Sequence, residues 1–151
     1  MKLSMKLFVT ALAITGMSAV TVAHAGPPVT VIFKNNGTTA ATYKVITTNE
    51  SYTYSFASPK PATTVLAGKT NTYVVTNPVS PDANSAVVRY QIGTKECVFL
   101  TTLVIAHNYT YNTTTPTWNK NATASGGAVC TATITPTNYV TYEWTANFSM
   151  K

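Results

Sequence analysis

Residues 142–150 read Tyr-Glu-Trp-Thr-Ala-Asn-Phe-Ser-Met, and this stretch decides the class of fold. Glu, Thr, Asn and Ser alternate with larger or more apolar side chains, so that one face receives Tyr142, Trp144, Ala146, Phe148 and Met150. A period of two is typical of a β-strand that buries one face and exposes the other. The stretch therefore predicts a half-buried strand that packs on an apolar core.

The same alternation recurs upstream of this strand. We expect further strands at residues 29–34, 40–47, 51–56, 63–66, 70–76, 86–92, 96–106 and 129–135. Asn35-Asn36-Gly37 and Gly93-Thr94-Lys95 predict tight turns, and the first turn would join residues 29–34 and 40–47 as a hairpin. No window has a clear 3.6-residue apolar period, and good helix formers are scarce. About eight to ten short strands predict an all-β, antiparallel β-sandwich of immunoglobulin-like or jelly-roll-like kind.

The first 25 residues have the layout of a secretory signal peptide. Lys2 and Lys6 precede an apolar run at residues 7–22, and Ala23-His24-Ala25 offers small residues for cleavage before Gly26. A membrane anchor is the alternative, but the apolar run is short and Gly26-Pro27-Pro28 follows it instead of a charged cluster. We expect an exported, secreted or periplasmic protein of a Gram-negative bacterium. Residues 26–151 would then form a single domain with a flexible start at residues 26–28.

Charge is sparse and evenly scattered. The chain has 151 residues, of which 45% are hydrophobic and 9% charged, with a formal net charge of +6. Removal of 25 residues would leave 126, and the loss of Lys2 and Lys6 would lower the charge to +4. Nucleic-acid binding normally needs clustered Lys and Arg, and the sequence has no such cluster. Threonine and asparagine supply the polarity instead, which leaves strand edges with few charges to prevent self-association.

Cys97 and Cys130 are the two cysteines of the chain. An even pair in an exported protein predicts one disulfide, whereas zinc would need ligands beyond His107. The order Cys97, Trp118, Cys130 resembles that of immunoglobulin domains, but the cysteines are too close together and Ala128 stands where those domains have tyrosine. This spacing argues against the usual disulfide between the two sheets.

The sequence offers little for catalysis. A Ser-His-Asp triad would have to use His107 and Asp82, the one aspartate, and no G-x-S-x-G motif surrounds a serine. A carboxylate pair would draw on Glu50, Glu96 and Glu143, of which the last two are expected to be solvated charges at strand edges. We therefore expect no enzyme activity, no catalytic residue, no metal and no cofactor.

The aromatic residues are the candidates for a binding site. Tyr52 and Tyr54 would share one face of a strand, as would Tyr109 and Tyr111, and Trp118 lies among threonine and asparagine. These rings either fill the sandwich core or form a platform for a glycan, a lipid surface or another protein. Tyr109, Tyr111 and Trp118 are the stronger candidates because their segment resembles a loop.

Three functions fit these observations. The first is an exported, non-catalytic β-sandwich that acts by binding or as a component of the cell surface. The second is a membrane-binding, toxin-like module, since the size, all-β pattern and aromatic content resemble small secreted proteins such as the aegerolysins. That resemblance is one of general layout. The third is a self-assembling fibre or matrix subunit, which the uncharged strands would favour.

Overall fold

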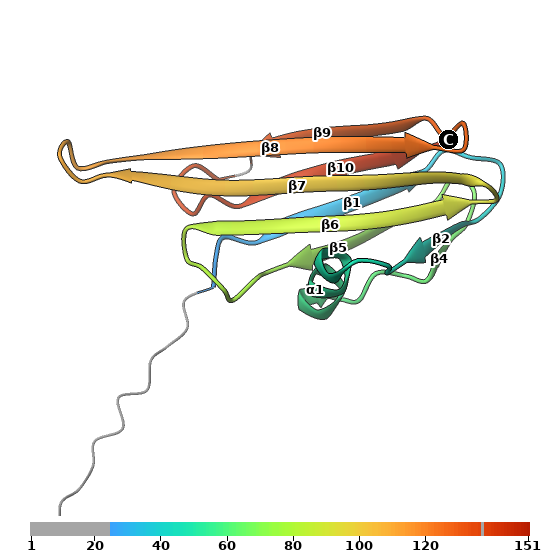
Figure 1. Ribbon diagram of the computed structural model, residues 1–151, viewed down its shortest axis with the longest axis horizontal. Helices are drawn as coiled ribbons and strands as arrows, with labels where there is room; N and C mark the ends of the chain where they lie inside the picture. Colours follow the sequence, from blue (N-terminus) through green and yellow to red (C-terminus); the bar gives the residue numbers. More distant parts are fainter. Residues whose placement is uncertain (1–24, 137) are drawn as a thin grey trace, which may run out of the picture.

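A computed structural model describes residues 25–136 and 138–151 of the chain (Figure 1). The predicted signal peptide lies outside these residues except for Ala25, which is exposed. The described residues form β1 (Val29–Asn35), β2 (Ala41–Lys44), α1 (Thr48–Phe56), β3 (Ala57–Ser58), β4 (Thr64–Val65), β5 (Thr70–Val75), β6 (Ala83–Ile92), β7 (Lys95–Asn108), β8 (Thr113–Ser125), β9 (Cys130–Pro136) and β10 (Trp144–Met150).

The strands make two five-stranded sheets that pack face to face, so the predicted all-β sandwich is confirmed. The first sheet has the order β3-β5-β1-β10-β9, and the second has the order β4-β2-β6-β7-β8. One pair departs from the predicted antiparallel arrangement, because β1 and β10 run parallel at the centre of the first sheet. Parallel neighbours need a long crossover connection, which here is nearly the whole domain. The pattern within each strand carries no information on that pairing.

The core confirms the alternation at the end of the chain. In β10, Trp144, Ala146, Phe148 and Met150 are all buried. The ring of Phe148 stacks on Phe99 of the second sheet with centroids 4.7 Å apart, and Trp144 donates a hydrogen bond from Nε1 to Thr101 Oγ1 at 2.9 Å. Tyr142 lies outside this strand, because its φ of 60° breaks the extended backbone before β10 begins.

The predicted hairpin between residues 29–34 and 40–47 is wrong. β1 belongs to the first sheet and β2 to the second, so the turn at Asn35-Asn36-Gly37 carries the chain from one sheet to the other. The buried Asn35 side chain holds this crossing: Nδ2 donates to the carbonyls of Thr39 and Val65, both at 2.8 Å, and Oδ1 accepts from Gly37 N at 2.9 Å. An Asn-Gly turn sets a local bend but does not choose the partner strand.

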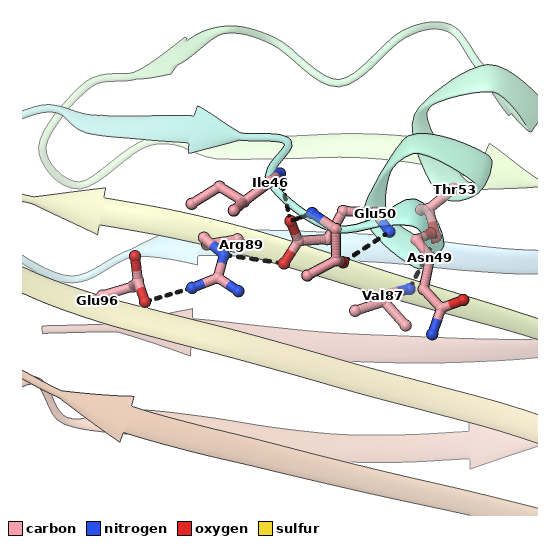
Figure 2. Close-up of polar contacts among 8 residues, drawn as sticks. Ile46, Asn49, Glu50, Thr53, Val87, Arg89 and Glu96 are labelled. Carbon is pink, nitrogen blue, oxygen red and sulfur yellow. Dashed lines mark hydrogen bonds and ion pairs between the residues drawn. The ribbon is translucent and has the colours of Figure 1, made fainter.

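The predicted strand at residues 51–56 is also wrong, since α1 occupies this segment. Thr47 is the N-cap, and Thr47 and Glu50 form a capping box in which each side chain bonds the backbone of the other. Figure 2 shows Thr53 of this helix reaching the edge of β6, where its Oγ1 accepts a hydrogen bond from Val87 N at 2.8 Å. The short β2 leaves that part of the β6 edge uncovered, and α1 satisfies it. The capping box outweighs the aromatic and hydroxyl alternation that favoured a strand.

Glu50 is fully buried and ties α1 to the second sheet. Its Oε2 accepts from Ile46 N at 2.6 Å and Thr47 N at 2.9 Å, and its Oε1 accepts from Arg89 Nε at 2.8 Å (Figure 2). Burial raises the pKa of Glu50, but the hydrogen bonds from Thr47 and Ile46 and the Arg89 guanidinium outweigh burial, so the pKa lies below its ordinary value. Arg89 also pairs with Glu96, which is therefore not the freely solvated charge that was predicted.

The predicted disulfide between Cys97 and Cys130 is present. Cys97 lies on β7 and Cys130 begins β9, so the bond joins the two sheets, contrary to the expectation from the immunoglobulin comparison. The short spacing between the two cysteines along the chain was misleading. β8 folds back along β7, and this brings the start of β9 beside the start of β7.

The predicted flexible start at residues 26–28 is wrong as well. Gly26 is buried and donates a hydrogen bond to the Asn77 carbonyl at 3.1 Å. A Cβ at Gly26 would overlap the Ala83 carbonyl oxygen and lie 2.7 Å from that of Ser80, so only glycine fits. Asn84 adds a hydrogen bond to the Pro27 carbonyl at 2.7 Å. These contacts anchor the segment before β1 and outweigh the flexibility expected of Gly-Pro-Pro.

Candidate functional site

One hairpin projects beyond the sandwich. The pairing of β6 with β7 reaches only as far as Ala83 and Val104, whereas β7 and β8 remain paired for four further residues, up to Asn108 and Thr113. At roughly 3.3 Å per residue, this extends the hairpin about 13 Å past the end of β6. Figure 1 shows the β7–β8 hairpin reaching farther than any other strand pair at that end of the molecule.

The tip of this hairpin presents two tyrosines on a well-defined turn. Asn108 Oδ1 accepts hydrogen bonds from Thr110 N at 3.1 Å and Tyr111 N at 3.3 Å, and Asn112 closes the turn with a φ of 50°. Tyr109 is 90% exposed and Tyr111 is 76% exposed. Asparagine suits both tasks, because its side chain bonds nearby backbone amides and it tolerates the left-handed conformation. The turn therefore displays both rings to solvent.

Two other loops at the same end are also stabilised by an asparagine side chain that accepts hydrogen bonds from nearby backbone amides. Residues 77–82 follow β5, and residues 138–143 precede β10. Asn77 Oδ1 accepts from Val79 N at 3.0 Å, and Asn138 Oδ1 accepts from Val140 N at 2.8 Å. Each loop exposes apolar or aromatic side chains: the exposed fractions are 78% for Val79, 70% for Tyr139 and 87% for Val140. We call residues 77–82, 109–112 and 138–143 together the three-loop end.

Side-chain contacts hold these loops to the projecting hairpin. His107 Nε2, near the end of β7, lies 2.9 Å from Asp82 Oδ1, and the Asp82 carbonyl accepts a hydrogen bond from Ile105 N at 2.8 Å. On the other side, the hydroxyls of Thr114 on β8 and Tyr142 lie 2.9 Å apart. The three loops thus form one connected surface, supported by β7 and β8.

Trp118 lies farther back than the tip tyrosines. It pairs with Leu103 in the β7–β8 ladder, is half-buried, and packs edge-on against the Tyr139 ring with centroids 5.7 Å apart. Its indole nitrogen is buried and has no hydrogen-bond partner among the described residues. The structure therefore does not place Trp118 with Tyr109 and Tyr111 at the tip, but behind them, where it supports the loop at residues 138–143.

Tyr52 and Tyr54 lie on α1 and not on the projecting hairpin, although Tyr52 lines a small hollow together with Asn77. They are two residues apart on α1, so they do not share a face as they would on a strand. Tyr52 stacks on Phe56 with centroids 6.2 Å apart, and Tyr54 lies 6.1 Å from the ring of Tyr43, with both Tyr52 and Tyr54 partly exposed. The prediction that they share one face of a strand is wrong because residues 51–56 are helical.

Charge separates along the long axis of the sandwich. The sequence of the three-loop end contains no Lys or Arg, and its acids are Asp82 and Glu143. The opposite end carries a group of basic residues, placed there by the strand registers and the turns between strands: Lys34, Lys69, Lys95 and Lys151. Lys95 and Lys151 line a hollow of about 400 Å³ at that opposite end. The two ends therefore suit ligands of different charge.

The sequence-based reasoning missed Val79, Tyr139 and Val140. Each lies one or two residues after an asparagine, as Tyr109 follows Asn108, and this recurrence is the signal that could have identified them.

The structure also brings His107 and Asp82 together, as a triad would require, but in the described part of the chain no serine hydroxyl hydrogen-bonds to the imidazole. Within residues 25–136 and 138–151 there is also no group of three or more His, Cys, Asp or Glu side chains that could hold a metal ion.

Among the residues that the structure covers, no helix is both long and apolar enough to cross a membrane. Comparison of the chain with protein-family models and with curated protein sequences found no match.

Proposed function

We propose that the chain is an exported, non-catalytic binding protein whose contact surface is the three-loop end. The observation that carries this proposal is the gathering of Val79, Tyr109, Tyr111, Tyr139 and Val140, each at least 70% exposed, at one end of a well-packed sandwich. Exposed apolar side chains that cluster in this way mark interaction sites in soluble proteins. Loops on a rigid β scaffold are also where binding residues concentrate.

The acidic residues support a role without catalysis. Glu50 accepts hydrogen bonds from backbone amides before α1 and forms an ion pair with Arg89. Arg89 also forms an ion pair with Glu96. The Asp82 carboxylate pairs with His107. These contacts engage three of the four acids, and the exposed groups of the three-loop end are mainly aromatic rings, valine side chains and hydroxyls.

Binding to cells tests the proposal. Labelled protein would be titrated onto intact cells and isolated envelopes of the producing organism. The double variant Tyr109→Ser/Tyr111→Ser should reduce the bound fraction by about tenfold, as the loss of an aromatic anchor does in other interfaces. The matched control is Tyr52→Ser/Tyr54→Ser, which also removes two partly exposed tyrosines but from α1 and not from the hairpin tip. Equal binding by the tip variant and the wild type would exclude the three-loop end as the contact surface.

A second candidate function is self-assembly through strand edges. β8 and β9 are the edge strands on one side of the two sheets, and β8 runs for 13 residues with Lys120 as its one charged side chain. A long edge with so little charge can pair with another strand. Sedimentation velocity should then show association that rises with concentration and is weakened by Thr117→Lys/Thr123→Lys on β8. A monomer at all concentrations would exclude this candidate.

A further inference from the structure

The chemistry of the exposed side chains at the three-loop end limits the chemical class of its binding partner. Tyr109, Tyr111 and Tyr139 combine an apolar ring with a hydroxyl, whereas Val79 and Val140 have no polar side-chain atom. Tyrosine prefers the boundary between water and the acyl chains of a bilayer, where the ring is desolvated and the hydroxyl stays hydrated. Valine gains from the same transfer by burial of apolar area.

The backbone of these loops is prepared for removal from water. The amides of Thr110 and Tyr111 donate to Asn108, those of Val140 and Thr141 donate to Asn138, and a third asparagine serves Val79 in the same way. An unsatisfied backbone amide is costly in an apolar environment. The asparagine side chains remove that cost before any contact with a partner. They also leave fewer free backbone amides to donate hydrogen bonds to the hydroxyls of a glycan.

The shape of the end, with one tip ahead of two loops, fits insertion of that tip into a layer better than it fits an enclosed ligand. The tip at residues 109–112 projects past the end of β6, and Val79, Tyr139 and Val140 belong to loops set farther back (Figure 1). Sites for small ligands are instead concave, with polar groups that converge on the ligand. The insertion would be shallow, because β8 is an edge strand whose outer backbone groups are not paired within the described sheet.

The charge of the three-loop end bears on which lipid headgroup it would bind. The three-loop end has no Lys or Arg in its sequence, its acids are Asp82 and Glu143, and Asp82 is paired with His107. Binding to anionic lipid normally draws on basic residues next to the membrane. On these grounds we infer that the three-loop end docks into the interfacial layer of a zwitterionic lipid surface, with Tyr109 and Tyr111 inserted first. This inference rests on the proposed function and names the partner of the same surface.

Vesicle co-sedimentation tests the inference. Protein would be mixed with vesicles of phosphatidylcholine alone and with vesicles of phosphatidylcholine and phosphatidylglycerol, at low and high ionic strength. We expect similar binding to both lipids and little effect of salt, because apolar burial is not screened. Tyr109→Ser/Tyr111→Ser should lower the partition coefficient by about tenfold or more, whereas Val79→Ser/Val140→Ser, in the loops behind the tip, should lower it by less than about twofold. The control Tyr52→Ser/Tyr54→Ser should bind as the wild type does.

Two results would overturn the inference. Binding that needs phosphatidylglycerol and disappears with salt would show that the opposite end of the sandwich, which carries Lys34, Lys69, Lys95 and Lys151, makes the contact. Absence of binding to either vesicle, while binding to cells still depends on Tyr109 and Tyr111, would show that the surface recognises a protein or a glycan. The second result would leave the proposed function intact, whereas cell binding that ignores both tyrosines would remove the proposed function as well.

Discussion

Replacement of Glu50 by Gln should destabilise the fold strongly. The carboxylate accepts two backbone hydrogen bonds at one oxygen and one from the Arg89 guanidinium at the other. A Gln amide has a single oxygen, so its NH₂ group must face either the two amides or Arg89, and donors then oppose donors. Loss of one partner of a buried ion pair typically costs about 3–5 kcal/mol in free energy of unfolding. We expect Glu50→Gln to fall in this range.

The matched control is Glu96→Gln, which removes the other carboxylate bound to Arg89. The Glu96 side chain is 26% exposed, so water can replace it, and we expect a loss within about 1 kcal/mol. Both variants would be unfolded in urea at pH 7 and followed by tryptophan fluorescence. With an m-value near 2 kcal/mol/M, the Glu50→Gln midpoint should drop by roughly 2 M. Equal midpoints for the two variants would refute the role assigned to Glu50.

The pH dependence of the same difference is a second check. The pKa of Glu50 is lower in the folded protein than its ordinary value of 4.5. Its ionisation therefore stabilises the fold above about pH 4.5, and this contribution is lost as the pH falls through the lower, native pKa. The gap between the wild type and Glu50→Gln should be full at pH 7 and shrink in acid. A gap that stays constant down to acid unfolding would contradict the proposed charge interaction.

Three further predictions concern the fold. The double variant Cys97→Ala/Cys130→Ala should lose about 3–4 kcal/mol in urea unfolding, because the disulfide closes a loop with a sequence separation of 33; a loss near zero would contradict this. Gly26→Ala should lower the melting temperature by several degrees, since about 1–3 kcal/mol is lost when a Cβ meets packed carbonyls; an unchanged melting temperature would mean that the segment is not docked. Burial raises the pKa of Tyr43, Tyr73 and Tyr90 well above 10.0, so these three of the nine tyrosines should ionise only on alkaline unfolding. An ultraviolet titration in which all tyrosines ionise together would contradict it.

The sequence predicted the features that depend on local pattern. The alternation in residues 144–150 identifies a half-buried strand, and Gly93-Thr94 identifies the turn between β6 and β7. The pairing of Cys97 with Cys130 followed from their being the two cysteines of the chain. Each of these predictions needed only neighbouring residues or simple counting, and each is confirmed.

The features that were missed depend on contacts across the fold. The parallel pair of β1 and β10 joins residues more than a hundred positions apart, which no local pattern specifies. Tyr52 and Tyr54 were assigned to a strand because the capping box at Thr47 and Glu50 was not weighed against their alternation. At the candidate site, the sequence identified Tyr109 and Tyr111, but only the strand registers show that Tyr139 lies at the same end.

The contact surface itself can be measured by oxidative footprinting of tyrosine side chains. The protein would be exposed to hydroxyl radicals free in solution and bound to envelopes or phosphatidylcholine vesicles, and oxidation at each tyrosine quantified by mass spectrometry. We predict that binding protects Tyr109, Tyr111 and Tyr139, while Tyr52 and Tyr54 on α1 remain as reactive as in the free protein. Protection of the α1 tyrosines, with the tip tyrosines still reactive, would contradict the assignment of the three-loop end as the binding surface.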